Sequence, residues 1–288
     1  ITDTCTTSTI TVSKYDYAYD ANGTRSQQLE QRTDSVTQGL GLTDTTRYGY
    51  DANDWRTGVA YPNKSTLYRL DPVGNRTGEK DTAAILADLG PGAFATTNAG
   101  LSRNTTSVFN RADWLLSQSD TINFMKNAQL SYDLAGNVTF KTSQVAPPRR
   151  FVWDIRNTLT IVSDGGPEKG RYDYDRNLQR VKRRAGFENI EYVLDDHFVL
   201  NETSGGITSR RYHYAKEPLS VVDSAGTKFQ SNDALGSVSD LTTTTGTVNS
   251  ARQYDAWGNF RAAAPTASEP KLGYTGHMHD TETGLIYA

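Results

Sequence analysis

Aromatic residues recur at every second position along many short stretches of the chain, and each stretch ends at an aspartate. Tyr15, Tyr17 and Tyr19 form one such set, and this spacing places a set on one face of a β-strand. An Asp-x-x-Gly-Asn type of segment follows, in which the Asp side chain can accept bonds from backbone amides downstream and Gly or Asn adopts positive φ. A returning strand such as 159–162 comes next, so the pattern predicts a β-hairpin for each unit.

The hairpin unit repeats with a nearly constant spacing. Successive Asp residues are 20, 21, 21 and 22 positions apart at 51 to 71, 133 to 154, 154 to 175 and 233 to 255. Such a period predicts one supersecondary unit stacked repeatedly. The units are Tyr19-Asp20 with Gly23, Tyr50-Asp51, Leu70-Asp71 with Gly74, Tyr132-Asp133 with Gly136, Trp153-Asp154, Tyr174-Asp175, Asn232-Asp233 with Gly236, and Tyr254-Asp255 with Gly258.

A single hairpin is marginal in water, so neighbouring units must pair edge to edge. We therefore expect an all-β protein, with one long curved or spiralling antiparallel sheet and aromatic ladders across its strands. Repeats occupy 1–77 and 109–230. The stretch 78–108 lacks the unit and is expected to be an insertion loop, in which Asp81 caps a short helix carrying Ile85, Leu86 and Leu89 and ending at Gly90-Pro91. Residues 145–150, with Pro147-Pro148, are expected to form a long turn.

Composition agrees with a thin sheet rather than a thick core. Only 36% of the 288 residues are hydrophobic and mean hydropathy is −0.62, yet 16 Tyr, 9 Phe and 4 Trp argue against disorder. The net charge of −3 without a basic tract does not favour nucleic acid as a partner. No apolar run is long enough to span a membrane. Cys5 is alone and cannot form an internal disulfide, and the lack of an initiator Met suggests a processed piece or a fragment.

The repeats carry a family resemblance. Asp71-Pro-Val-Gly-Asn-Arg, Tyr132-Asp133-Leu-Ala-Gly-Asn and Trp153-Asp154-Ile-Arg-Asn-Thr-Leu resemble the YD repeats of bacterial Rhs proteins. Residues 231–288 resemble the start of the Rhs-associated core, with a motif that contains Tyr274, Gly276, Asp280, Gly284 and Leu285.

The resemblance implies a hollow shell wound from a ribbon of hairpins. Bacterial members enclose a C-terminal toxin domain, as in type VI secretion effectors and the C component of Tc toxin complexes, and animal teneurins use a similar barrel for adhesion. The family's aspartate-dependent self-cleavage segment, Arg-x-Arg-Tyr-Tyr-Asp-Pro and a later Asp-Pro, is absent from this chain. We therefore expect no catalytic residue and no self-cleavage here.

Other candidate sites are weak. His277 and His279 lie two apart, near Asp280 and Glu282, but a zinc site needs three or four ordered ligands, so we expect no metal and no cofactor. Asp195-Asp196-His197 predicts a turn, as do Gly165-Gly166 and Gly205-Gly206 as two-residue hairpin loops. The basic clusters are expected on solvated strand faces, or alternatively on an inner wall facing an acidic cargo; they are Arg149-Arg150, Lys182-Arg183-Arg184 and Arg210-Arg211.

Three functions follow from these observations. The first is a shell segment of an exported bacterial protein, whose partners are its own C-terminal toxin domain or cargo, further YD-repeat segments, and secretion-spike or toxin-complex subunits. The second is an extracellular adhesion or carbohydrate-binding scaffold, in which exposed aromatics such as Tyr15, Tyr17, Tyr19 and Trp257 stack on glycans. The third, a free-standing enzyme, lacks a convergent acid, base and nucleophile in the sequence.

Overall fold

The computed structural model describes residues 12–33, 40–62, 64–83, 103–121, 127–144, 146–261 and 269–287. Within these ranges the regular structure is β-strand, apart from one 3-10 turn, η2 (Tyr274–Gly276). The strands are β1 (Ser13–Tyr19), β2 (Arg25–Thr33), β3 (Leu40–Tyr50), β4 (Arg56–Tyr61), β5 (Lys64–Leu70), β6 (Arg76–Ala83), β7 (Arg103–Phe109), β8 (Leu115–Asp120), β9 (Ala128–Tyr132), β10 (Val138–Thr142), β11 (Arg149–Trp153), β12 (Leu159–Asp164), β13 (Glu168–Tyr174), β14 (Arg180–Ala185), β15 (Glu188–Asp195), β16 (Phe198–Ser204), β17 (Ile207–Tyr214), β18 (Pro218–Asp223), β19 (Gly226–Asn232), β20 (Val238–Thr243), β21 (Val248–Ala251), β22 (Met278–Asp280) and β23 (Leu285–Tyr287).

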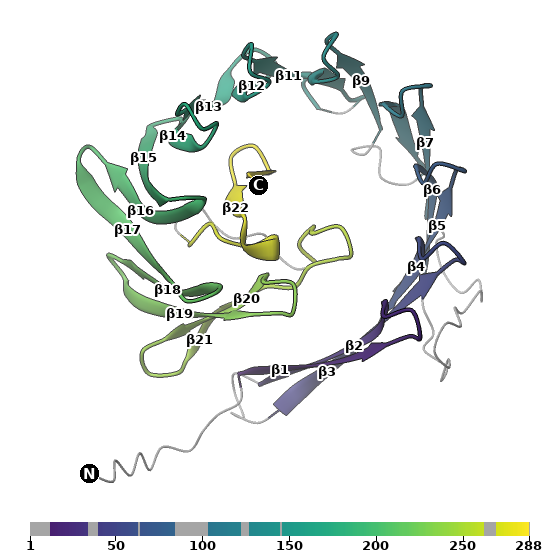
Figure 1. The fold of residues 1–288 in the computed structure, drawn as a ribbon, viewed down its shortest axis with the longest axis horizontal. Coiled ribbons are helices and arrows are strands. Elements are labelled where there is room, and N and C mark those ends of the chain that lie inside the picture. The colour runs from purple at the N-terminus through teal and green to yellow at the C-terminus, as the bar shows by residue number, and fades with distance from the viewer. Residues whose placement is uncertain are drawn as a thin grey trace.

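One 21-stranded sheet makes up the wall of the molecule. From β1 to β21, each strand pairs antiparallel with the next along the chain. Figure 1 shows this ribbon of hairpins curling into a ring, with the C-terminal hairpin β22–β23 inside it. The predicted fold class, a long curved antiparallel sheet of repeated hairpins, is confirmed.

A single carboxylate or amide side chain organises each repeat loop. In the loop at Asp154, Oδ1 accepts hydrogen bonds from the backbone N–H groups of Arg156 (2.9 Å) and Thr158 (3.0 Å). The third residue after the Asp, here Asn157 at φ 62°, is left-handed, which explains the preference for Gly, Asn or Asp there. The described loops built this way begin at Asp20, Asp51, Asp71, Asn110, Asp133, Asp154, Asp175, Asp233 and Asp255.

One of these loops was not anticipated. Asn110 accepts bonds from the amides of Ala112 (2.9 Å) and Trp114 (3.0 Å), as the aspartates do elsewhere. An Asn side chain offers the same acceptor oxygen, so a search for Tyr-Asp overlooks the unit. Between β14 and β19 the loops are of other kinds; 205–206, for example, is a two-residue loop as expected. Outside that stretch, the loop expected to consist of Gly165 and Gly166 has three residues, 165–167, and connects β12 to β13.

The expected insertion at 78–108 is narrower at both ends in the structure. Strand β6 continues to Ala83 and β7 begins at Arg103, and these two strands pair with each other. Asp81 lies within β6, where it accepts a hydrogen bond from the Thr66 hydroxyl at 2.6 Å, so it is not a helix cap. Residues 85, 86, 89, 90 and 91 of the expected helix lie outside the described residues, as does Cys5. The turn expected at 145–150 ends earlier: Pro147 and Pro148 lie between β10 and β11, whereas Arg149 and Arg150 already belong to β11.

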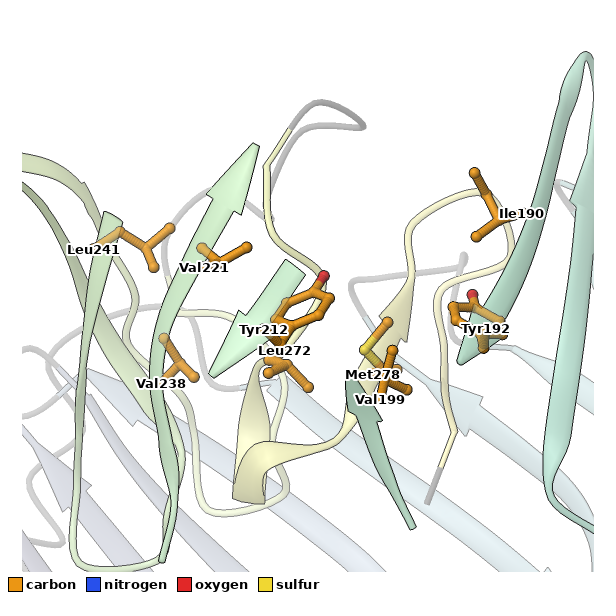
Figure 2. Close-up of a cluster of buried hydrophobic side chains, with 9 residues drawn as sticks. All are labelled: Ile190, Tyr192, Val199, Tyr212, Val221, Val238, Leu241, Leu272 and Met278. Carbon is orange, nitrogen blue, oxygen red and sulfur yellow. The ribbon is translucent and has the colours of Figure 1, made fainter. Parts of the chain in front are cut away.

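Buried apolar side chains form two clusters instead of one central core. The smaller cluster consists of Tyr48, Val59, Tyr61 and Tyr68 on β3–β5. The larger one lies where the C-terminal residues meet the inner face of β15–β20 (Figure 2), and its members are Ile190, Tyr192, Val199, Tyr212, Val221, Val238, Leu241, Leu272 and Met278. The wall is therefore a single layer of sheet, and its apolar side chains form buried clusters where another segment packs against it.

Candidate functional site

Residues 269–287, here called the inner segment, lie inside the ring against the wall (Figure 1). Near its start, the backbone N–H of Val238 donates to the Gly273 carbonyl at 3.0 Å. Near its end, the Tyr287 hydroxyl accepts a hydrogen bond from the backbone N–H of Arg180 at 2.8 Å. The segment is thus held at both ends by strands of the wall.

A buried ion pair anchors the middle of the inner segment. The Arg180 guanidinium contacts the Asp280 carboxylate at 2.5 Å, and their side chains are 2% and 5% exposed. Arg180 also lies 4.3 Å from the centre of the Tyr287 ring. Burial works against the charge of Arg180, but Asp280, Tyr192 and Tyr172 together outweigh it and raise the pKa of the guanidinium. A buried charge without its partner is strongly destabilising. Loss of Asp280 would therefore leave Arg180 as an unpaired charge on the wall, and loss of Arg180 would leave Asp280 unpaired on the inner segment.

The basic clusters do not all lie on solvated faces, and that expectation is wrong for one arginine in each. Strand alternation turns this arginine inward and leaves Arg150 and Arg211 exposed. The inward members are Arg149, bound to Asp164 and to the Thr283 carbonyl, Arg183, bound to Glu188 and Glu282, and Arg210, bound to Glu202. Two of these arginines contact the inner segment: Arg183 pairs there with the carboxylate of Glu282, and Arg149 donates to the Thr283 carbonyl.

All five residues of the core motif lie in the inner segment. Tyr274 and Gly276 form η2, Asp280 ends β22, and Leu285 begins β23 after the left-handed Gly284 (φ 68°). The Tyr274 ring packs on the repeat loop at 255–259: a Cβ added to Gly258 would lie 2.5 Å from that ring. The motif thus marks the segment that touches the wall from within.

The histidine pair is split between two environments. His277 is exposed, whereas His279 is buried and its Nε2 accepts a hydrogen bond from the Tyr274 backbone N–H at 3.1 Å. Burial and the nearby Arg252 lower the pKa of His279 to about 4. That nitrogen is therefore already used, and the described residues contain no group of three or more His, Cys, Asp or Glu placed to hold a metal ion. Asp196 and His197 form the expected turn between β15 and β16, with Asp196 at φ 51°.

At five of the nine described repeat loops, the aromatic residue just before the loop bonds to the unit before it. The Tyr174 hydroxyl, for example, donates to the Leu159 carbonyl, five residues after Asp154. The acceptor is always the residue five after the Asp or Asn of the preceding loop. The other pairs are Tyr50 with Arg25, Tyr132 with Leu115, Trp153 with Val138, and Tyr254 with Val238. The alternating aromatics therefore join hairpins at the loop rim of the sheet.

The ring is closed at a seam where strands β1–β6 meet residues 230–261. Arg32 is paired with Asp240, and the Tyr61 hydroxyl accepts a hydrogen bond from the Ala256 backbone N–H at 2.9 Å. Among the described strands, β1 pairs along its backbone with β2 alone. Side chains, rather than a strand ladder, therefore close the ring.

No protein-family model matches the sequence. The chain is 27% identical over 265 residues to the probable deoxyribonuclease RhsA of Dickeya dadantii, covering 85% of this chain and 18% of RhsA. It is 26% identical over 229 residues to the tRNA nuclease WapA of Bacillus subtilis, covering 76% of this chain and 9% of WapA. The chain thus spans less than a fifth of either relative, and both names describe the whole proteins.

Solved structures share the fold. The TcdB2–TccC3 complex aligns with a TM-score of 0.52 at 14% identity, over 94% of this chain and 17% of that one. The Tc holotoxin pore of Photorhabdus luminescens aligns with a TM-score of 0.51 at 14% identity, over 96% of this chain and 17% of that one. In sequence the chain is similar to Rhs proteins. Its described part shares the fold of the hairpin scaffold in the Tc structures.

Most of the aromatics expected to stack on glycans are engaged in contacts within the hairpin wall. Tyr15 accepts a hydrogen bond from Arg32 at 3.1 Å, and the Tyr17 hydroxyl accepts one from the Ala234 backbone N–H at 3.0 Å. Trp257 is 46% exposed, but its indole N–H donates to the Tyr68 hydroxyl at 2.9 Å. The geometry therefore assigns these rings to the wall and its seam. No helix among the described residues is long and apolar enough to cross a membrane.

Proposed function

We propose that this Rhs-type chain is part of the wall of a shell that encloses a polypeptide cargo, a toxin domain that follows the repeats in the complete protein. The observation that carries the proposal is the position of the inner segment. The inner segment lies inside the ring of strands (Figure 1), and near its end the aromatic ring of Tyr287 is 6.4 Å from that of Tyr174 on the wall. Residues attached after Tyr287 would start on the enclosed side.

The inner surface also offers sites where an enclosed polypeptide can be held. A cavity of about 510 Å³ lies between the wall and the inner segment, and Phe198, Val199, Leu272 and Met278 contribute apolar walls. Pockets of this size and character accept apolar side chains. An unfolded or partly folded cargo exposes such side chains, so the wall can retain it without a dedicated catalytic site.

In this proposal the chain acts with other parts of an exported bacterial protein. Further YD-repeat segments would extend the wall, and subunits of a toxin complex or a secretion spike would dock on the completed shell. The solved Tc structures support this reading through the shared fold.

Protection of the cargo tests the proposal. The complete native protein would be sequenced beyond Ala288 and digested with trypsin, and the fragments followed by mass spectrometry. We expect a non-repeat domain after Ala288 that survives trypsin while the wall is folded and is degraded once urea unfolds the wall. Cleavage of that domain at the rate of the same domain expressed alone, or a chain that continues only as repeats, would contradict enclosure.

A further inference from the structure

Cationic side chains lie over aromatic rings at six positions in the described chain, and four of these cations have a carboxylate partner. Stacking on the ring face favours a cation, and the carboxylate then balances its charge. The balanced pairs are Lys64 with Asp81, Arg76 with Glu79, Arg180 with Asp280, and Arg261 with Asp44.

The two remaining cations share one ring and have no acidic partner. The guanidinium carbons of Arg25 and Arg56 each lie 5.2 Å from the centre of the Tyr48 ring. Arg25 donates to the Gln28 side chain at 3.2 Å and Arg56 to the Ala256 carbonyl at 3.1 Å. Neither forms an ion pair within the part of the chain that the structure describes, and the buried Nε of Arg56 has no hydrogen-bond partner there.

A cavity of about 50 Å³ lies beside these two arginines, at the seam between the N-terminal hairpins and residues 253–256. That is room for several waters, or for one small ion that displaces them. The hydroxyl-bearing rings of Tyr15, Tyr61 and Tyr274 also line it. The site therefore combines unbalanced positive charge, an unused donor and space.

The carboxylates that line this cavity bind groups other than Arg25 and Arg56. Glu30 is paired with Arg32 and accepts a hydrogen bond from Gln253 at 3.1 Å. Asp233 and Asp255 accept the backbone N–H groups of their own repeat loops. They do not neutralise Arg25 and Arg56 by direct contact.

We propose that this cavity, the Tyr48 site, binds one small oxyanion between Arg25 and Arg56. A guanidinium presents parallel N–H donors that match the two oxygens of a carboxylate, phosphate or sulfate. The bound anion would balance the positive charge of these two arginines, as the Asp280 carboxylate balances that of Arg180. Its source is either a free inorganic ion or an acidic side chain of a polypeptide that lies against the seam.

Thermal unfolding at constant ionic strength tests the Tyr48 site. The protein would be titrated with sodium sulfate against sodium chloride, and in a second arm with N-acetyl-glutamate amide. We expect a saturable rise in Tm with at least one probe. A rise with sulfate identifies a free-ion site, and a rise with the glutamate derivative alone identifies a site for an acidic side chain.

Matched variants decide whether the effect arises at this site. Arg25→Gln and Arg56→Gln should each abolish the saturable rise, whereas Arg76→Gln, which removes a stacked cation already paired with Glu79, should leave it intact. If Arg56→Gln does not fold, Arg25→Gln carries the test. An equal rise in Arg25→Gln and wild type, or no saturable rise with either probe, would overturn the proposal.

Discussion

The Tyr174 hydroxyl donates a hydrogen bond to the Leu159 carbonyl oxygen at 2.8 Å and so joins two successive repeat units. Burial raises the pKa of Tyr174 to about 12, so the hydroxyl keeps its proton and remains a donor at any physiological pH. Equivalent bonds recur at the rim. The aromatic residue of the YD motif is therefore a connector between units as well as a strand former.

Removing this hydroxyl should weaken the wall. Tyr174→Phe keeps the ring but leaves the carbonyl without its donor, which should lower the free energy of unfolding by about 1 kcal/mol. Urea denaturation would measure the change. Tyr19→Phe is the control, because Tyr19 is 59% exposed and its hydroxyl makes no hydrogen bond within the described residues. Equal losses in the two variants would refute the connecting role.

Gly136 and Gly23 both require a left-handed backbone, but only Gly136 also lies against another side chain. Both are left-handed, at φ 88° and 83°. A Cβ at Gly136 would lie 3.1 Å from the Trp114 ring, whereas at Gly23 it would meet nothing within 4 Å. Each change to Ala should therefore cost about 1–2 kcal/mol for the backbone, and Gly136→Ala should cost about 1 kcal/mol more for overpacking. Chemical denaturation of the two variants checks the difference, and a larger loss in Gly23→Ala would contradict it.

Breaking the Arg180–Asp280 pair should release the inner segment. Asp280→Asn leaves a buried cation without its counter-charge, which should cost about 3–5 kcal/mol. Hydrogen exchange should show faster exchange of the amides of β22 and β23 than of the wall strands. The double change Arg180→Met with Asp280→Leu should recover part of the stability, because no charge is then left buried.

A surface pair provides the control for that experiment. Lys182 and Glu191 contact each other at 2.8 Å, but the Glu191 side chain is 56% exposed. Glu191→Gln should change stability by less than about 1 kcal/mol. If Asp280→Asn behaved in the same way, the ion pair would not be what holds the segment.

His279 should make stability depend on pH in a defined window. Its pKa is lowered from 6.5 to about 4 in the fold, so between these values the unfolded chain binds a proton that the folded chain does not. Stability is therefore fully present above pH 6.5 and declines as pH falls towards 4. His279→Gln should flatten the dependence of Tm on pH in that window, while His197→Gln, on an exposed turn, should not. Equal slopes in the two variants would exclude His279 as the cause.

The sequence predicts the local structure well because each repeat loop is determined by residues that are close together in the sequence. Asp154 and the residues up to four places beyond it determine their own loop, and the period-two aromatics determine the strand before it. The Asn110 loop does not follow the Tyr-Asp pattern, because an Asn side chain supplies the acceptor oxygen there. A search for any Asx followed by a left-handed position would have found it.

Contacts that bridge distant parts of the chain could not be predicted in this way. Arg180 and Asp280 are 100 positions apart, and Arg32 and Asp240 are 208 apart. Nothing in a twenty-residue period indicates which hairpins meet once the ribbon has curled. Strand alternation shows that Arg149 and Arg150 point to opposite faces, but only the curvature of the sheet shows which face is enclosed.

The side-chain seam also makes the ring sensitive to the number of hairpins it contains. Within the ladder, each strand recognises only its neighbours, so a unit can be added or lost without disturbing the rest. At the seam, one extra hairpin would shift β20 relative to β2 by two strand spacings, about 10 Å. That displacement would separate Arg32 from Asp240 and Tyr61 from Ala256. The seam contacts therefore fix the number of hairpins in the ring, although the repeated hairpins themselves do not.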